Sequence, residues 1–245
     1  MGKHKKQDPA NARRRQEKTS PSSPAARATS GSATTPAPAA APRPTPLTGE
    51  VLGRLRAGTH HDPHSVYGAH RDGDGSVVRT MQPGAVSVEI DFGDRTVPME
   101  PVSDGLFEAA LPEAEVPDYR FRVAYADGHT RTVADGYRFL PTLGEVDLHL
   151  IGEGRHERLW DVLGAHVRTY DSPGGPVTGT SFAVWAPNAR GVSVVGDFCG
   201  WNPVALPMRS IGSSGVWELF VPDVGDGAVY KYRVRGADGL SLIHI

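Results

Sequence analysis

The feature that most constrains this chain is an internal repeat. Short motifs from the first half return in the second half, in the same order and at nearly constant separation. The matched pairs are Val66-Tyr67-Gly68-Ala69-His70 with Val162-Leu163-Gly164-Ala165-His166, Val86-Ser87-Val88 with Val192-Ser193-Val194, Asp91-Phe92 with Asp197-Phe198, Pro98-Met99 with Pro207-Met208, Gly105-Leu106-Phe107-Glu108 with Gly215-Val216-Trp217-Glu218, and Tyr119-Arg120-Phe121-Arg122-Val123 with Tyr230-Lys231-Tyr232-Arg233-Val234. So many matches in one order indicate two copies of one structural module.

Each copy is a series of short runs in which apolar and polar residues alternate. In the first copy these runs predict strands over residues 76–81, 86–90, 105–111 and 119–123, followed by a turn at Asp127-Gly128. Frequent strands with no long helix between them are typical of an antiparallel β-sandwich. We therefore expect an all-β protein, with two tandem immunoglobulin-like β-sandwiches after a disordered N-terminal tail.

The tail is expected from composition. Residues 1–46 are rich in Lys and Arg and then in Pro, Ala, Ser and Thr, so they cannot bury enough apolar surface to offset their chain entropy. Order is expected to begin near Leu47, where Thr48 can cap a short helix that Gly58 ends.

The remaining boundaries follow from the repeat. We predict the first sandwich over residues 47–150, a linker over 151–163, and a truncated second sandwich over 164–239. Beside the linker, Val146, Leu148 and Leu150 fit a strand by their period, whereas Leu159 and the residues after it fit a short helix. Residues 240–245 do not continue the module as the first copy does, and we expect this end to be non-native.

Charge and cysteine content exclude several classes of protein. The formal net charge of −2 gives the chain as a whole no basis for binding nucleic acid or an anionic membrane, and no apolar run is long enough to span a bilayer. Cys199 is the single cysteine, so no internal disulfide forms and the expected compartment is the cytoplasm.

A histidine-rich segment raises the question of a metal. The run His60-His61-Asp62-Pro63-His64, with His70 downstream, matches none of the zinc spacings and has no cysteine beside it. We expect a polar turn whose imidazoles bond to the backbone or to a neighbouring domain, with no metal and no cofactor.

The loop after Val192-Ser193-Val194-Val195 carries one large aromatic, Trp201, among turn-forming residues. Two interpretations are open: Trp201 folds back over the edge of the sandwich, or it forms an exposed platform on which a pyranose ring stacks. Matching the copies through Asp91-Phe92 places Arg95 where the second copy has Trp201, which favours the surface. Lys231 and Arg233 should point outward from the last predicted strand, although a solvated sheet face would show the same period.

These residues also resemble a known family. Val194-Val195-Gly196-Asp197-Phe198 with Gly200-Trp201, preceded by residues 182–189 and followed by Gly215-Val216-Trp217-Glu218 and Tyr230-Lys231-Tyr232, resembles the carbohydrate-binding module of family 48. The chain is similar to the N-terminal half of bacterial glycogen branching enzymes in the order of its motifs at residues 58–64, 144–145, 151–154 and 163–166. This likeness covers residues 47–239.

The resemblance implies specific roles. Trp201 would stack on glucose, Lys231 would bond to its hydroxyls, and the partners would be an alpha-glucan and a catalytic barrel of the same polypeptide. Two positions depart from the family pattern: Cys199 stands where Asn is usual, and Asn202 where Asp is usual. The carboxylates of a retaining transglycosylase belong to a (β/α)₈ barrel that these residues do not contain, so we assign no catalytic residue and expect this chain alone to be inactive.

The leading hypothesis is therefore the N-terminal part of a 1,4-alpha-glucan branching enzyme of glycogen biosynthesis, which supplies glucan-binding and positioning modules. A stand-alone glycogen-targeting protein, a tandem sandwich without a ligand, and the N-terminal region of a debranching enzyme are the alternatives. Affinity for glucan, and its loss when Trp201 is replaced, would separate the binding proteins from a purely structural pair of sandwiches.

Overall fold

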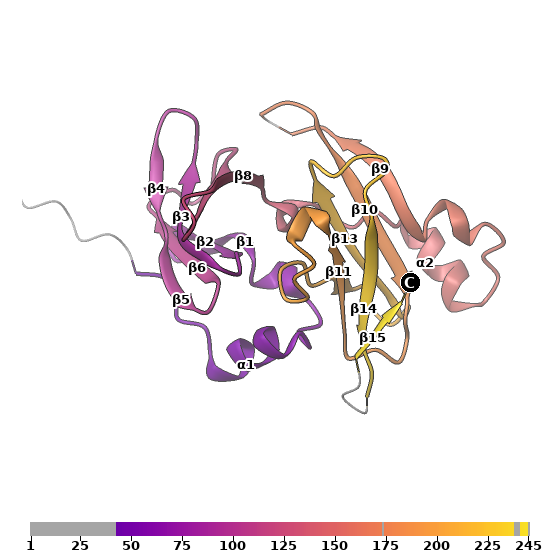
Figure 1. Cartoon of the computed structure of the whole chain (residues 1–245). Helices are drawn as coiled ribbons and strands as arrows, with labels where there is room; N and C mark the ends of the chain where they lie inside the picture. Colours follow the sequence, from indigo (N-terminus) through magenta and orange to yellow (C-terminus); the bar gives the residue numbers. More distant parts are fainter. Residues whose placement is uncertain (1–42, 173, 238–240, 245) are drawn as a thin grey trace, which may run out of the picture. The chain divides into compact units, whose positions relative to one another are not determined.

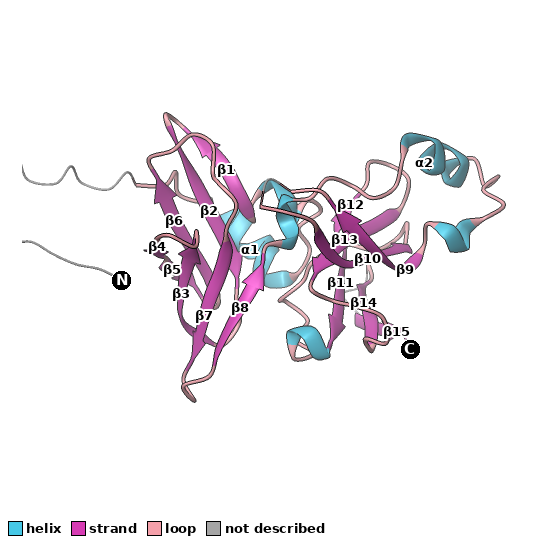
Figure 2. Cartoon of the chain, turned by 90° about the horizontal axis from the view of Figure 1, so that it is seen from above, coloured by secondary structure: helices cyan, strands magenta, loops and turns pink. Residues whose placement is uncertain are grey.

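The computed structural model describes residues 43–172, 174–237 and 241–244, and strands are its main element (Figures 1 and 2). The predicted tail lies almost wholly outside the described residues. The expected all-β class is confirmed, with every strand pair antiparallel.

The first copy holds two four-stranded sheets, ordered β1-β2-β6-β5 and β4-β3-β7-β8. The four predicted runs each coincide with one of these strands. The elements are α1 (Gly49–Ala57), a 3-10 helix (Pro63–Ser65), β1 (Gly68–Asp72), β2 (Gly75–Met81), β3 (Ala85–Asp91), β4 (Thr96–Pro98), β5 (Glu100–Ser103), β6 (Leu106–Leu111), β7 (Arg120–Tyr125), β8 (Thr130–Ala134) and a 3-10 helix (Gly136–Arg138).

The second copy holds one sheet ordered β12-β13-β10-β9 and one ordered β11-β14-β15. Its elements are α2 (Glu145–Gly152), a 3-10 helix (Leu159–Asp161), β9 (Gly164–Tyr170), β10 (Val177–Trp185), β11 (Gly191–Gly196), a 3-10 helix (Asp197–Cys199), β12 (Arg209–Ser210), β13 (Val216–Pro222), β14 (Tyr230–Arg235) and β15 (Ser241–His244).

The helix before the first sandwich forms as the sequence predicts. The Thr48 hydroxyl accepts a hydrogen bond from the Val51 amide at 3.3 Å, and Gly58 ends α1 in the left-handed conformation, with φ of 62°. The strand suggested by Val146, Leu148 and Leu150 is wrong, because these residues lie in α2. The short helix expected near Leu159 is confirmed as a 3-10 helix.

The repeat extends to individual contacts. Both copies run from an α-helix through a 3-10 helix into a strand that begins at a glycine, Gly68 or Gly164, with φ of 91° or 99°. Two residues later an imidazole Nε2 bonds to a backbone carbonyl, His70 to Tyr67 at 2.9 Å and His166 to Leu163 at 3.0 Å. The same local sequence therefore builds the same entry into each sandwich.

The β1-β2-β6-β5 sheet packs on both faces. Phe107 joins the core of the first sandwich, while its neighbour Leu106 joins a second cluster that contains Phe182, Val194 and Leu219 of the second copy. Successive side chains of a strand point to opposite faces of the sheet, so neighbouring residues of a sheet that is buried on both faces pack into different clusters. The two sandwiches thus share a continuous apolar cluster.

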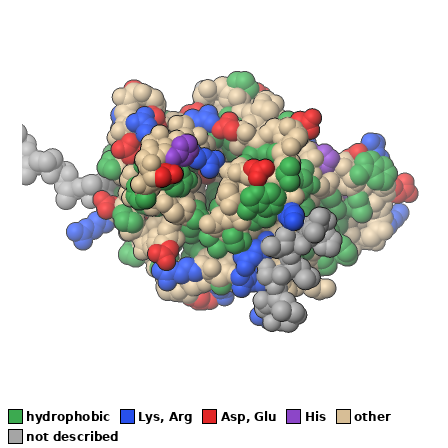
Figure 3. Space-filling model, viewed as in Figure 1, with side chains coloured by type: hydrophobic (Ala, Val, Ile, Leu, Met, Phe, Trp, Pro, Cys, Tyr) green, Lys and Arg blue, Asp and Glu red, His purple; other side chains and the backbone are tan. Residues whose placement is uncertain are grey.

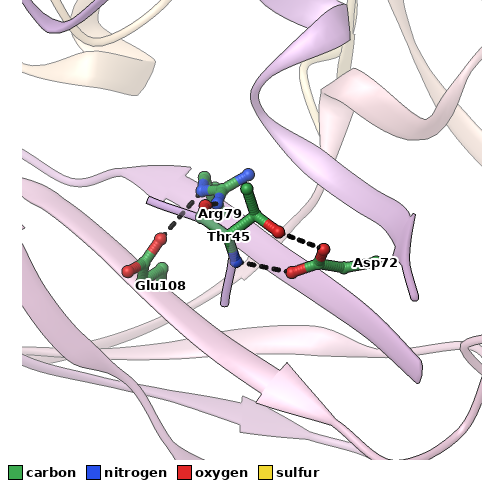
Figure 4. A network of polar contacts seen from close by, with 4 residues as sticks. All are labelled: Thr45, Asp72, Arg79 and Glu108. Atoms are coloured by element: carbon green, nitrogen blue, oxygen red, sulfur yellow. Dashed lines mark hydrogen bonds and ion pairs between the residues drawn. The ribbon is translucent and has the colours of Figure 1, made fainter. Parts of the chain in front are cut away.

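A polar network holds the start of the described chain against this sheet (Figure 4). The Thr45 amide and hydroxyl donate to the two carboxylate oxygens of Asp72 at 2.6 and 2.5 Å, and these bonds lower the pKa of Asp72. The Arg79 guanidinium donates to the Thr45 carbonyl at 2.7 Å and to Glu108 Oε2 at 2.8 Å. Arg79 is almost fully buried, and a buried charge needs a partner of opposite charge, which Glu108 provides.

Candidate functional site

The loop after β11 closes through its own backbone. The Trp201 amide donates to the Gly196 carbonyl at 2.9 Å, and the Gly200 amide donates to the Asp197 carbonyl at 3.2 Å. The Cys199 sulfur accepts from the Gly196 amide and donates to the Gly196 carbonyl, both at 3.4 Å. Burial raises the pKa of the Cys199 thiol, so this side chain is a structural part of the turn rather than a nucleophile.

Phe198 anchors the loop. Its ring stacks on Phe182 with centroids 5.7 Å apart, and Phe182 meets the edge of Tyr230 at 4.8 Å. From β8 of the first copy, Arg131 Nη2 donates to the Phe198 carbonyl at 3.0 Å. An aromatic anchor on one side and a guanidinium on the other hold the loop in one position.

Trp201 lies at the surface. It is 39% exposed, whereas the core tryptophan Trp217 is 2% exposed. Its indole Nε1 donates to Asp197 Oδ1 at 2.6 Å, which fixes the ring, and its φ of 58° is a conformation that costs a bulky residue on the order of 1–3 kcal/mol. The loop therefore holds a large aromatic ring at the surface on a backbone conformation that is uncommon for a bulky residue.

Lys231 lies beside this ring. It is on β14, opposite Val195 of β11, and its Nζ is 6.0 Å from the centroid of the Trp201 ring. The structure thus brings together the two site residues predicted from the sequence. An apolar ring face and an ammonium group with three donors suit a ligand that has both C–H and hydroxyl groups.

Asp197 was not predicted from the sequence as the partner of Trp201. The spacing of four residues around a turn was the available signal, since a carboxylate at that distance can reach the indole N–H. This contact makes Asp197 a positioning residue for the exposed ring.

The proposed equivalence of Arg95 and Trp201 is wrong. In the first copy, Val88 pairs with Val123, and the Val88 carbonyl accepts a hydrogen bond from the Met99 amide. In the second copy, Val192 pairs with Val234, and the Val192 carbonyl accepts a hydrogen bond from the Met208 amide. Val88 therefore corresponds to Val192, not to Val194.

The same ladders show that the loop differs in length between the copies. In the first copy the loop lies between the paired residues Glu89 and Pro98, and in the second copy it lies between the paired residues Ser193 and Pro207. The loop of the second copy is five residues longer. Arg95 lies beside the short turn at Phe92, and its guanidinium is 4.7 Å from the centroid of that ring. Trp201 therefore belongs to the longer loop of the second copy, and Arg95 is not its counterpart.

The histidine segment packs onto the second sandwich. The His61 ring lies 5.5 Å from the Trp217 ring, and the His61 carbonyl accepts from the Ser210 amide at 2.7 Å. His60 Nδ1 accepts from the Asp62 amide at 3.3 Å. The contacts of His60 and His61 agree with the expected polar turn, whereas the His64 ring packs on Tyr137 and its two buried nitrogens have no hydrogen-bond partner among the described residues. Within residues 43–172, 174–237 and 241–244 there is no group of three or more His, Cys, Asp or Glu side chains that could hold a metal.

The buried acids have structural partners. Glu218 pairs with Arg209, and Asp135 accepts from the Tyr119 hydroxyl and the Tyr137 amide. Burial raises the pKa of both carboxyls. Each acid is bound inside a sandwich, so neither is placed to act on an external substrate. In the described part of the chain, no helix is both long and apolar enough to cross a membrane.

Comparisons with known proteins agree with this architecture. Residues 48–137 match the family model described as the N-terminal domain of the alpha-1,4-glucan branching enzyme GlgB, and residues 162–245 match carbohydrate-binding module 48, the isoamylase N-terminal domain. Pullulanase from an Anoxybacillus species aligns with 73% of this chain and 25% of its own, at 16% identity and a TM-score of 0.26.

Two curated relatives are more informative. The 1,4-alpha-glucan branching enzyme GlgB of Nocardia farcinica is 58% identical over 83% of this chain, and that of Mycolicibacterium paratuberculosis is 57% identical over 77%. The matched region is 27% and 26% of those enzymes, so this chain spans about a quarter of their length. The chain therefore consists largely of a GlgB N-terminal domain and a carbohydrate-binding module 48, and it corresponds to that part of 1,4-alpha-glucan branching enzymes GlgB.

Proposed function

We propose that this chain binds alpha-glucan at Trp201 and Lys231 and positions it for branching during glycogen biosynthesis. The observation that carries the proposal is the exposed Trp201 ring, which Asp197 orients and which lies 6.0 Å from the Lys231 ammonium. The residues belong to a module matched as carbohydrate-binding, which supports a sugar as the ligand.

The chemistry of the pair suits glucose. One face of a pyranose ring presents C–H groups that pack on an indole, while its edge presents hydroxyls that accept from an ammonium. The strained backbone at Trp201 and its bond to Asp197 hold the ring before the sugar arrives, so little side-chain entropy is lost on binding.

Affinity for glycogen and maltoheptaose tests the proposal. We expect Trp201→Ala to weaken binding about tenfold or more, equivalent to about 1.4 kcal/mol, measured by calorimetry or affinity electrophoresis. Lys231→Met, which keeps an unbranched side chain of similar size but removes the ammonium group, should weaken it by a smaller factor. Trp160→Ala is the matched control, because Trp160 is 67% exposed but lies outside the loop. Unchanged affinity of the folded Trp201→Ala variant would contradict the proposal.

We further propose that the chain acts with a catalytic barrel in the cytoplasm. Support comes from its match to branching enzymes and from the presence of a single cysteine, Cys199, which rules out an internal disulfide. The retaining reaction needs a pair of carboxylates at one glycosidic bond, and the buried acids described above serve the sandwiches instead. We expect the purified chain to leave amylose unbranched, so a shift in its iodine stain would refute this part.

A further inference from the structure

A cleft of about 530 Å³ lies between the β7–β8 hairpin of the first copy and the loop over residues 197–206 of the second. Its volume is within the range of roughly 300–1,000 Å³ that is usual for sites of small molecules. Trp201 and Lys231 are not among the residues that line it, so it is distinct from the pair described above.

Aromatic and planar polar side chains form its walls. Tyr125 and His129 stack with ring centroids 6.2 Å apart and an interplanar angle of 21°. Arg131 lies on the same hairpin, and Asp197 and Asn202 face it from the loop. Rings beside planar hydrogen-bonding groups are the combination by which proteins bind a ligand with apolar faces and polar edges.

These polar groups keep unused hydrogen-bonding capacity within the described residues. Arg131 uses Nη2 on the Phe198 carbonyl, which leaves Nε and Nη1. Asp197 uses Oδ1 to accept from Trp201, and Asn202 uses Oδ1 to accept from Val204, which leaves its amide nitrogen. The cleft therefore offers both donors and acceptors, as a hydroxyl group requires.

The charges around the cleft are balanced. The Arg131 guanidinium and the Asp197 carboxylate both line the cleft, and Asp223, just after β13, forms an ion pair with Arg120. On the face shown in Figure 3, acidic and basic side chains are likewise interspersed rather than gathered by sign. Opposite charges in equal number give no net attraction for an anion or a cation, whereas both groups can bond to hydroxyls, so the walls suit a neutral polyol.

We propose that this cleft is a second alpha-glucan subsite, which holds a short maltooligosaccharide segment between the two sandwiches. The proposal rests on the glucan specificity proposed above and adds a separate place for the chain to bind. Asp197 is common to both sites, because it lines the cleft and orients Trp201.

Amide NMR of the full chain, titrated with maltotriose, tests the cleft directly. Amides of the β8 strand and of Asn202 should shift, and these shifts should persist in Trp201→Ala. His129→Ala should weaken the β8 response about fivefold or more, while Thr130→Ala, the neighbouring exposed residue that does not line the cleft, should leave it unchanged. Ala205→Trp, which fills the cleft from the loop side, should abolish the β8 response.

The outcomes separate the two proposals. Loss of every shift in Trp201→Ala, or equal responses in His129→Ala and Thr130→Ala, would overturn the second subsite and leave Trp201 as the glucan site. A β8 response that persists while Trp201→Ala leaves glycogen affinity unchanged would support the cleft and refute the role of Trp201.

Discussion

Arg209→Met should expose the cost of a buried charge. The Arg209 Nε and Nη2 atoms both lie 3.0 Å from Glu218 Oε2, and the Glu218 side chain is fully buried. Removing one member of a buried pair leaves the other uncompensated, which costs about 3–5 kcal/mol. This is a large share of the roughly 5–15 kcal/mol that stabilises a typical domain. We expect urea unfolding near neutral pH to show a loss of this size.

The loss of stability in Arg209→Met should become smaller as the pH falls. Burial raises the pKa of Glu218 above its ordinary value of 4.5, and Arg209 opposes that rise. Without Arg209 the folded pKa rises further, so the folded state takes up a proton before the unfolded state does as the pH falls. The deficit should therefore be largest near neutral pH and should shrink as the pH falls toward 4.5.

Two further variants make the test decisive. Arg209→Met with Glu218→Leu should recover most of the stability, because an apolar pair of similar volume leaves no buried charge. Arg155→Met removes an exposed ion pair with Glu153 and should change the stability by no more than about 0.5 kcal/mol. A deficit that is independent of pH, or a double variant as unstable as the single one, would refute the reasoning.

Other substitutions test the local structure. Gly58→Ala should lower the free energy of unfolding by about 1 kcal/mol, because φ is 62° at this position. Gly53→Ala, inside α1 with open space around it, should raise the free energy of unfolding by about 0.5–1 kcal/mol. Urea titrations that gave the opposite order would contradict the role of Gly58 as the C-cap of α1. Burial, with Arg209 and His70 nearby, lowers the pKa of His64 to about 3, so stability should fall as the pH drops from about 6.5 toward 3 and the unfolded state takes up a proton. His64→Phe should flatten that part of the pH profile of urea unfolding, and parallel profiles for the two proteins would exclude His64 as the cause.

The sequence predicted most of the strands because alternation and turn residues are local signals. It did not predict α2, since Val146, Leu148 and Leu150 alternate as a strand would and none of them is buried in the helix. It also matched Val88 to Val194 instead of Val192. A two-residue slip keeps every side chain on the same face, so the hydrophobic pattern cannot detect it.

The site was predictable in part for the same reason. Trp201 and Lys231 carried local signals, namely turn formers around the ring and alternation along the strand. The cleft carried none, because Arg131 and Phe198 are 67 residues apart in the sequence and meet only when the two sandwiches pack together. Contacts of that kind depend on tertiary structure.

The closing rung of each sandwich has a consequence for engineering. This rung is the hydrogen bond from the Met99 amide to the Val88 carbonyl in the first copy and from the Met208 amide to the Val192 carbonyl in the second. The two bonds close loops of different length at equivalent positions. Residues 194–206 could therefore replace residues 90–97 with both closing bonds kept, at the loss of the β3–β4 pairs Ile90–Val97 and Asp91–Thr96. Such a chimera would carry two tryptophan loops on one chain. If both bound the same polysaccharide, the second contact would be intramolecular, and the gain in avidity would measure how far apart the two loops stand.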